Sequence, residues 1–383
     1  MMRSEYIGKL QFYWRMKKNL KEKNLVPDFV DFSFTLDKEN NLIKQKIDKK
    51  TILYLETIYK ENYNVGYLQE GHALSNLYGD DFLKFIISSI KNHFPETKKI
   101  FEIGAGGCFM LNKLKAYGFN VNAIDPSPIA LNAGNKYKIN VIQEFYPCLD
   151  NFISSDLIFH YDVLEHIEDP VSFLNFNYND LNNNGLVIIA VPDCSEYIKK
   201  GDISMILHEH LNYFDEDSLK MVINKSKLSL VQIKRSNYGR VLFGLAKKDK
   251  DKQKTKKIES SENKFELFIK NYKSLKNQIL GHIIKSSKNG KTLGFYIPLR
   301  ALPYLSLLRE INKVNIRFFD DNEGIYNNYF DGFNFKIENF SDLVDNPPDI
   351  LYVFSEAFGI TIKEKVQISS SKIEILTLED FIR

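Results

Sequence analysis

Residues 101–108 read FEIGAGGC, and this segment is the strongest indication of the fold. It joins a short apolar run, 100–103, to a segment with helical periodicity, 109–116, and this order predicts a strand, a tight turn and a helix. Glycine lacks a Cβ, so Gly104 and Gly106 let a ligand approach the backbone, and the first N–H groups of the following helix face that ligand. The pattern favours a nucleotide-type site, with a tight turn that binds nothing as the alternative.

Strand and helix signals alternate on both sides of this turn. A helix is expected at 80–93, and further strands and helices follow residue 108 in a regular series: helices at 109–116, from 128, from 170 and at 218–226, and strands at 121–124, near 141, at 157–159, 186–191, 228–233 and 241–246. Parallel strands need crossover helices, so the alternation predicts a doubly wound, seven-stranded α/β sheet. Strand signals recur at 292–297, 315–319, 350–354 and 373–376, and they predict a second, smaller Rossmann-like α/β domain.

Composition excludes several classes of protein. The 383 residues carry 52 Lys and Arg against 49 Asp and Glu, a net charge of +3 that does not favour nucleic acid as a partner. Apolar runs such as 186–191 are far shorter than the ~18 residues of a membrane span, and residues 1–18 have no secretory h-region, so we expect no span and a cytoplasmic location. The three cysteines, Cys108, Cys148 and Cys194, are isolated and predict neither a disulfide framework nor a zinc site.

Acidic residues follow the predicted strands at the carboxyl edge of the sheet. Asp125 ends the second strand about twenty residues after the glycines, where a carboxylate accepts hydrogen bonds from two ribose hydroxyls. Asp162, Glu165 and His166 follow a later strand at the same edge, where ligands collect. Phe109 stands where a dinucleotide fingerprint needs its third glycine, which disfavours an NAD-linked enzyme.

Taken together, these motifs resemble the class I S-adenosylmethionine-dependent methyltransferases over roughly residues 80–247. The matching segments are EIGAGG at 102–107, AIDPS at 123–127, DVLEHIEDP at 162–170 and GLVIIAVPD at 185–193. The resemblance implies a set of cofactor contacts for S-adenosyl-L-methionine: Gly104 and Gly106 along the methionine part with Glu102 beneath them, Asp125 on the ribose, Glu144 or Phe145 beside the adenine, and Asp162 near the transferable methyl group.

The segment HEHLNYFDEDSL, 208–219, is similar to a signature of bacterial C-methyltransferases that act on nucleotide-linked deoxysugars. That family also has a second α/β domain, similar to 285–383, and an element similar to 63–72 that contributes to the substrate pocket, which makes Tyr67 a candidate substrate contact. The resemblance implies His210 as the catalytic base, with Glu209 and His208 beside it. These residues have two other interpretations: they brace the turn before a helix capped by Asp215, or they bind a metal. We expect no metal, because neighbouring ligands lack an evident third partner.

The chain departs from that family at three places. Residues 1–60 contain no cysteine, whereas the family has a cysteine-ligated zinc module there. Leu207 occupies the position of a tyrosine that precedes HEH in the family. The turn at 294–301 reads GFYIPLRA instead of a glycine-rich sequence, so we do not expect it to bind a nucleotide. The second domain is then expected only to form one wall of the cleft.

We therefore expect four parts: a small irregular N-terminal module on the substrate side (1–78), a cofactor-binding methyltransferase domain (79–247), a charged linker and helix (248–284) and a C-terminal α/β domain (285–383). The expected reaction is O-methylation of a nucleotide-activated sugar used for a surface polysaccharide or glycoside. C-methylation of a nucleotide-linked keto-deoxysugar and an inactive protein that binds S-adenosylmethionine are the alternatives. The sequence leaves the oligomeric state open.

Overall fold

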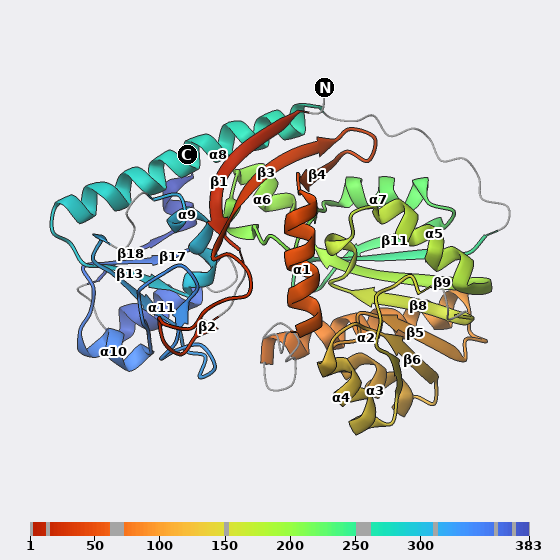
Figure 1. The fold of residues 1–383 in the computed structure, drawn as a ribbon. Coiled ribbons are helices and arrows are strands. Elements are labelled where there is room, and N and C mark those ends of the chain that lie inside the picture. The colour runs from red at the N-terminus through yellow and green to blue at the C-terminus, as the bar shows by residue number, and fades with distance from the viewer. Residues whose placement is uncertain are drawn as a thin grey trace.

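The computed structural model describes residues 3–12, 16–61, 73–148, 153–249, 262–308, 313–355, 359–369 and 373–382. Within them, a seven-stranded sheet and a five-stranded sheet lie side by side (Figure 1). An antiparallel N-terminal sheet lies between them at the top of the view, and the long helix α8 (Glu262–Lys288) runs over the five-stranded sheet. No helix in these ranges is both long enough and apolar enough to cross a bilayer.

The seven-stranded sheet has the strand order β11-β12-β9-β8-β5-β6-β7. Its strands are β5 (Lys99–Ile103), β6 (Asn120–Ile124), β7 (Asn140–Ile142), β8 (Ser155–Tyr161), β9 (Leu181–Pro192), β11 (Ser229–Arg235) and β12 (Val241–Lys247). Strands β5 to β9 run parallel, and β12 pairs antiparallel with both β9 and β11. The predicted doubly wound sheet is confirmed.

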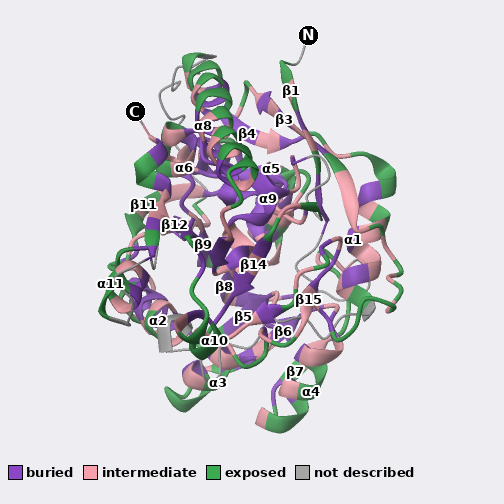
Figure 2. Ribbon diagram, turned by 90° about the vertical axis from the view of Figure 1, so that its left-hand side faces the viewer, coloured by how far each residue is buried: buried purple, intermediate pink, exposed green. Residues whose placement is uncertain are grey.

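Helices cover both faces of this sheet. They are α2 (Ala73–His93), α3 (Phe109–Ala116), α4 (Pro128–Tyr137), α5 (Pro170–Asp180) and α7 (Glu216–Lys225), whereas the short helix α6 (Ser195–Lys200) packs against α8. Residues of α2 and α3 pack into one core with one side of the central strands, and residues of α5 and α7 pack into a second core with the other side. Because both faces are covered, residues 186–191 of β9 are fully buried, as in other parallel sheets (Figure 2).

The N-terminal part is regular, so the prediction of an irregular module was wrong. Strands β1 (Ser4–Gln11), β3 (Phe29–Asp37) and β4 (Leu42–Gln45) form an antiparallel sheet, and helix α1 (Lys49–Glu61) follows. The alternation in β3 is short, with Phe32, Phe34 and Leu36 buried between polar residues. The fourth strand, β10 (Asn212–Tyr213), comes from the loop that follows the HEH segment at 208–210. No local sequence pattern therefore predicts this sheet.

The C-terminal sheet has the order β16-β14-β13-β17-β18, and all its strands run parallel. Its strands are β13 (Leu293–Tyr296), β14 (Ile316–Phe319), β16 (Ile337–Glu338), β17 (Ile350–Val353) and β18 (Glu374–Thr377), with helices α8 (Glu262–Lys288), α9 (Leu302–Leu305), α10 (Phe340–Asp345) and α11 (Gly359–Ser369). The predicted second parallel sheet is thus present. Most of the predicted charged linker, 250–261, lies outside the described residues.

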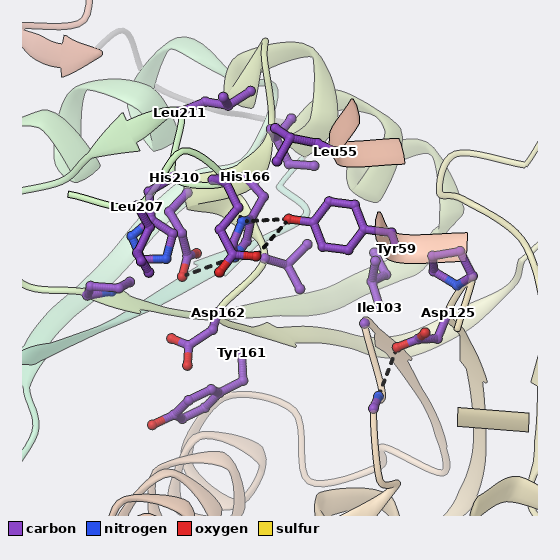
Figure 3. Close-up of a pocket in the computed structure, with 18 of the residues that line it drawn as sticks. Leu55, Tyr59, Ile103, Asp125, Tyr161, Asp162, His166, Leu207, His210 and Leu211 are labelled. Carbon is purple, nitrogen blue, oxygen red and sulfur yellow. Dashed lines mark hydrogen bonds and ion pairs between the residues drawn. The ribbon is translucent and has the colours of Figure 1, made fainter. Parts of the chain in front are cut away.

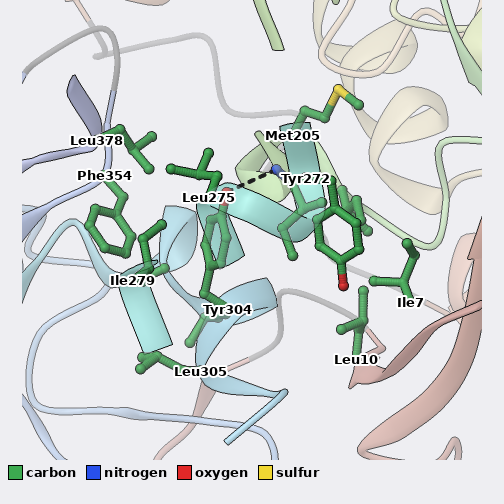
Figure 4. Close-up of a cluster of buried hydrophobic side chains, with 14 of the residues drawn as sticks. Ile7, Leu10, Met205, Tyr272, Leu275, Ile279, Tyr304, Leu305, Phe354 and Leu378 are labelled. Atoms are coloured by element: carbon green, nitrogen blue, oxygen red, sulfur yellow. Dashed lines mark hydrogen bonds between the residues drawn. The ribbon is translucent and has the colours of Figure 1, made fainter. Parts of the chain in front are cut away.

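One hydrophobic core joins these parts. It combines side chains from the N-terminal sheet, the loop after β9, helix α8 and the C-terminal sheet; Figure 4 shows Ile7, Leu10, Met205, Tyr272, Leu275, Ile279, Tyr304, Leu305, Phe354 and Leu378. Within it the backbone N–H of Ile203 donates to the Tyr304 hydroxyl at 3.2 Å. A two-stranded ribbon of β2 (Met16–Lys17) and β15 (Tyr329–Phe330) adds a further link. This packing fixes N-terminal and C-terminal residues beside the carboxyl edge of the seven-stranded sheet.

Candidate active site

A cavity of about 770 Å³ opens at the carboxyl ends of β5, β6 and β8. Its walls come from the glycine turn, the loops after β6, β8 and β9, helix α1 and the C-terminal part of the chain. All the predicted cofactor residues line it: Glu102, Gly104, Gly106, Asp125, Glu144, Phe145 and Asp162. We call the part around Gly104 and Asp125 the cofactor end, and the part around Glu165, His166, Glu209 and His210 the acceptor end.

The turn at the cofactor end requires glycine. Gly104 has φ +77° and Gly106 has φ +47°, in the left-handed region that side chains disfavour. A Cβ on Gly104 would also lie 2.5 Å from Cγ2 of Val163, and non-bonded carbon atoms do not approach one another so closely. The turn therefore leaves its backbone open toward the cavity.

Asp125 is held by the same turn. Its Oδ2 accepts a hydrogen bond from the Gly106 N–H at 2.8 Å, and its Oδ1 accepts one from the Ser127 N–H at 2.8 Å. Ser127 in turn caps α4 by accepting from the Ala130 N–H. Each carboxylate oxygen has a second lone pair, so the fixed, buried carboxylate can still accept hydroxyl donors from a ligand.

Glu102 is an unsatisfied acceptor beneath the turn. The residue is 4% exposed, and its Oε2 has no hydrogen-bond partner among the described residues. Burial, and secondarily the charge of Asp125, raise the pKa of this carboxyl well above its usual value. A buried acceptor that faces a cavity fits a ligand with hydroxyl or ammonium donors, as S-adenosylmethionine has. Glu144 and Phe145 lie more openly at the rim, and Phe145 is 41% exposed.

Three carboxyl groups lie at the acceptor end or at its border with the cofactor end. Asp162 follows β8 with φ +53°, and burial together with the Glu209 charge raises its pKa to about 7. Burial, and then the charge of Asp162, raise the pKa of Glu165 well above its usual range. Burial also raises the pKa of Glu209. Burial therefore disfavours the ionised form of these carboxyls, and a cationic ligand at this end of the cavity would stabilise their negative charge.

Two histidines meet over these carboxyls. The rings of His166 and His210 lie with centroids 5.0 Å apart in a T-shaped arrangement (Figure 3). Nδ1 of His166 lies 2.8 Å from the Glu209 carbonyl oxygen and 3.1 Å from the Tyr59 hydroxyl, and that hydroxyl donates to Oε2 of Glu209 at 3.3 Å. Burial lowers the pKa of His210 well below its usual value, so its imidazole is neutral at pH 7.

His208 does not belong to this group, which corrects the prediction that it stands beside His210 in the catalytic site. It does not line the cavity; its ring packs 5.2 Å from the rings of Phe12 and Phe32, and its Nδ1 lies 3.3 Å from the Gln45 side-chain amide. The reason is a turn in which the His210 N–H donates to the Leu207 carbonyl. This turn directs the two histidines to opposite sides.

Several residues that line the cavity were not predicted from the sequence. Helix α1 contributes Leu55 and Tyr59, and the C-terminal part contributes Arg300 and Phe330. They come from segments without a recognisable motif. Leu55 and Tyr59 belong to a small cluster with Phe12, Ile58 and Leu211, whereas Phe330 belongs to the shared core. The predicted substrate contact Tyr67 lies outside the described residues.

Comparison with known proteins identifies the fold's class. A family model described as a methyltransferase domain matches residues 75–233. These residues form an S-adenosylmethionine-dependent methyltransferase domain. The enzyme class and the cofactor predicted from the sequence are thus confirmed, whereas the match leaves the acceptor open.

Relatives and solved structures resemble the methyltransferase domain at low identity. The ubiquinone biosynthesis O-methyltransferase of Rickettsia typhi is 24% identical over 186 residues, covering 44% of this chain and 73% of that protein. The Rickettsia canadensis protein of the same name is 30% identical over 116 residues, covering 28% and 49%.

Two solved structures are also similar in part. The N-methyltransferase NodS of Bradyrhizobium japonicum in complex with S-adenosyl-L-homocysteine has a TM-score of 0.38 and 17% identity, covering 51% of this chain and 96% of that chain. The 1,6-didemethyltoxoflavin-N1-methyltransferase of Burkholderia thailandensis has a TM-score of 0.42 and 12% identity, covering 56% and 95%.

Proposed function

We propose that this chain transfers a methyl group from S-adenosylmethionine to a hydroxyl oxygen of a nucleotide-activated sugar. The observation that carries the proposal is the continuity of one cavity, which runs from Gly104 and Asp125 to His210 and Arg300. Such a cavity accommodates a methyl donor at one end and a polar acceptor at the other.

The cofactor end supplies the contacts for the donor. Asp125 accepts hydrogen bonds from the ribose, Glu144 and Phe145 border the adenine at the rim, and Glu102 and Gly104 border the methionine part. Bound S-adenosylmethionine carries an electrophilic methyl group on a positively charged sulfur. The Asp162 carboxylate, between the two ends, attracts that positive charge when it is ionised.

The acceptor end supplies alignment and a base. His210 is neutral, and its ring faces the cavity, so it can take the proton of an acceptor hydroxyl. Glu209 receives the Tyr59 hydroxyl on one carboxylate oxygen, which fixes the carboxylate and leaves its other oxygen for a sugar hydroxyl. Alignment of the oxygen with the methyl carbon then accounts for most of the rate enhancement.

Two arginines support a phosphorylated acceptor. Arg300 lies in the 3₁₀ turn Pro298–Arg300 of the C-terminal part, and Arg240 lies after β11; both line the cavity. A guanidinium binds phosphate oxygens in a fixed, bidentate geometry. The C-terminal part would then form one side of the cavity and also contribute Arg300 as a phosphate contact.

Oxygen is the preferred acceptor atom. Methylation of carbon needs a keto group whose oxygen is stabilised while a carbanion forms, and the apolar Leu207 lines the cavity beside His210. Methylation of oxygen needs only the base. The relatives named above are O-methyltransferases by name. C-methylation of a keto-deoxysugar is the alternative that the test must distinguish.

A phenolic hydroxyl on an aromatic ring is a second candidate acceptor. It is favoured by the names of the relatives and by the apolar side chains Leu55, Leu207 and Phe330 in the cavity wall. An acceptor of this kind does not need the two arginines.

The test is methyl transfer to a panel of acceptors. The full chain is incubated with isotope-labelled S-adenosylmethionine and with nucleotide-linked sugars, free sugars or phenols, and products are analysed by mass spectrometry and NMR. We expect a gain of one methyl group on a nucleotide-linked sugar, attached to oxygen. Attachment to a ring carbon would overturn the choice of oxygen, and transfer to phenols alone would replace the sugar as acceptor.

A further inference from the structure

The acceptor end contains a cluster with the composition of a metal site. Glu165, His166 and His210 each offer one ligand atom, and these atoms all lie within 4.8 Å of one another. Glu165 and His166 belong to the 3₁₀ turn Leu164–His166 after β8, whereas His210 comes from the loop before β10. The sequence argued against a metal because His208 and His210 lacked a third ligand, and the fold replaces His208 by two ligands from the other segment.

The tautomer of His166 prepares one nitrogen for a cation. Its Nδ1 lies 2.8 Å from the Glu209 carbonyl oxygen, which can only accept, so Nδ1 carries the proton. Nε2 is then left with a lone pair. This arrangement, in which the far nitrogen of an imidazole donates to a carbonyl, is the one that orients histidines bound to metals.

The lone pair of His166 faces another acceptor. Nε2 lies 3.8 Å from Oε1 of Glu165, which is too long for a hydrogen bond. Both carboxylate oxygens of Glu165 are buried without a hydrogen-bond partner among the described residues, and the residue is 1% exposed. Within that part of the chain no Lys or Arg forms an ion pair with Glu165 either. A cation placed between these two acceptors would satisfy both of them.

His210 completes the set. Its ring lies 5.0 Å from that of His166, and neither ring nitrogen makes a protein hydrogen bond in the described ranges. The ring also lines the cavity, so a ligand bound there is reachable from the acceptor side.

We propose that Glu165, His166 and His210 bind a divalent transition-metal ion. Two imidazoles and one carboxylate suit ions such as Mn²⁺, Fe²⁺, Co²⁺ or Zn²⁺, whereas Mg²⁺ and Ca²⁺ prefer ligand sets made of oxygen. Three protein ligands leave coordination positions open toward the cavity.

The role of this ion rests on the proposed function, although the site itself does not. An acceptor hydroxyl that binds the ion becomes more acidic and is held beside the methyl donor. Its proton passes to the Glu209 carboxylate, the oxygen forms a bond to the methyl carbon, and the C–S bond breaks with its electron pair left on sulfur. In this arrangement His210 is a ligand, and the ion replaces it in activating the hydroxyl.

Metal binding can be measured without any acceptor. The full chain, free of affinity tags and stripped of metals with EDTA, is titrated with Co²⁺ while its visible absorption is recorded. We expect one Co²⁺ per chain, displaced by Zn²⁺.

Glu165→Gln and His210→Ala should each weaken binding by roughly 10- to 100-fold or more. His93→Ala removes an exposed histidine at the end of α2 and should change nothing. Calorimetry with S-adenosylmethionine verifies that each variant is folded.

The outcomes separate this proposal from the proposed function. Failure to bind Co²⁺, or equal binding by wild type, Glu165→Gln and His210→Ala, overturns the metal site. Methyl transfer that continues in EDTA overturns the role of the ion and leaves the O-methyltransferase proposal standing, with His210 as base. Stoichiometric Co²⁺ binding that both variants lose supports the site even when no nucleotide-linked sugar is methylated.

Discussion

The two ends of the cavity are built in different ways. At the cofactor end, Gly106, Asp125 and Ser127 follow two neighbouring strands, and the backbone N–H groups of Gly106 and Ser127 both donate to the Asp125 carboxylate. At the acceptor end, Tyr59, His166 and Glu209 come from three distant segments and meet only in the folded chain. We therefore expect cofactor binding to depend on the loops after β5 and β6, and acceptor chemistry to depend on how the N-terminal and C-terminal parts pack onto the methyltransferase domain.

The largest expected effect comes from His210→Ala. Loss of the base or metal ligand should lower kcat by about 10² to 10⁴. The cofactor end does not involve this residue, so the affinity for S-adenosylmethionine should stay the same. Steady-state kinetics and calorimetry measure the two quantities. Unchanged turnover would remove His210 from the chemistry, and loss of cofactor affinity would show that the two ends are not independent.

Asp125→Ala should produce the opposite result. Removing a buried acceptor costs about 1–3 kcal/mol, or roughly 5- to 150-fold in the dissociation constant for S-adenosylmethionine. With the cofactor at saturating concentration, kcat should recover most of its wild-type value. Wild-type affinity in this variant would contradict the ribose assignment.

Asp162 lies between the two ends, and its charge gives a pH dependence. Its pKa is raised to about 7, so the carboxyl is largely ionised above pH 7 and protonated below it. Only the ionised form attracts the sulfonium, so the affinity for S-adenosylmethionine should fall by up to about tenfold from pH 8 to pH 6. S-adenosylhomocysteine, whose sulfur is neutral, is the matched control. Asp162→Asn should abolish the difference; an equal pH dependence for both ligands would argue against this placement.

The smallest expected effect comes from His208→Leu. The ring packs against Phe12 and Phe32 on the far side of the loop, so an apolar side chain of similar size fits there. The free energy of unfolding should change by about 1 kcal/mol as the contact with Gln45 is lost. Chemical denaturation and kinetics measure this. A loss of kcat comparable to that of His210→Ala would mean that both histidines serve the reaction.

The same contrast explains what the sequence could predict. The glycine turn, Asp125 and the strand-helix alternation are local features, and they predicted the sheet and the residues that line the cofactor end. Tyr59 and Arg300 have no motif, because their positions depend on packing between distant segments. Tyr59 packs against the cluster of Phe12, Leu55, Ile58 and Leu211, and the neighbours of Arg300 pack in the core that joins the N-terminal sheet, α8 and the C-terminal sheet. His208 was misplaced because its direction depends on a single turn between Leu207 and His210.

The most direct test of the central claim is a crystal structure of the chain with S-adenosylhomocysteine. We predict that the ribose contacts Asp125 and that the sulfur points past Asp162 toward His166 and His210. A ligand bound outside this cavity, or bound in it with the sulfur directed away from the histidines, would contradict the division into a cofactor end and an acceptor end.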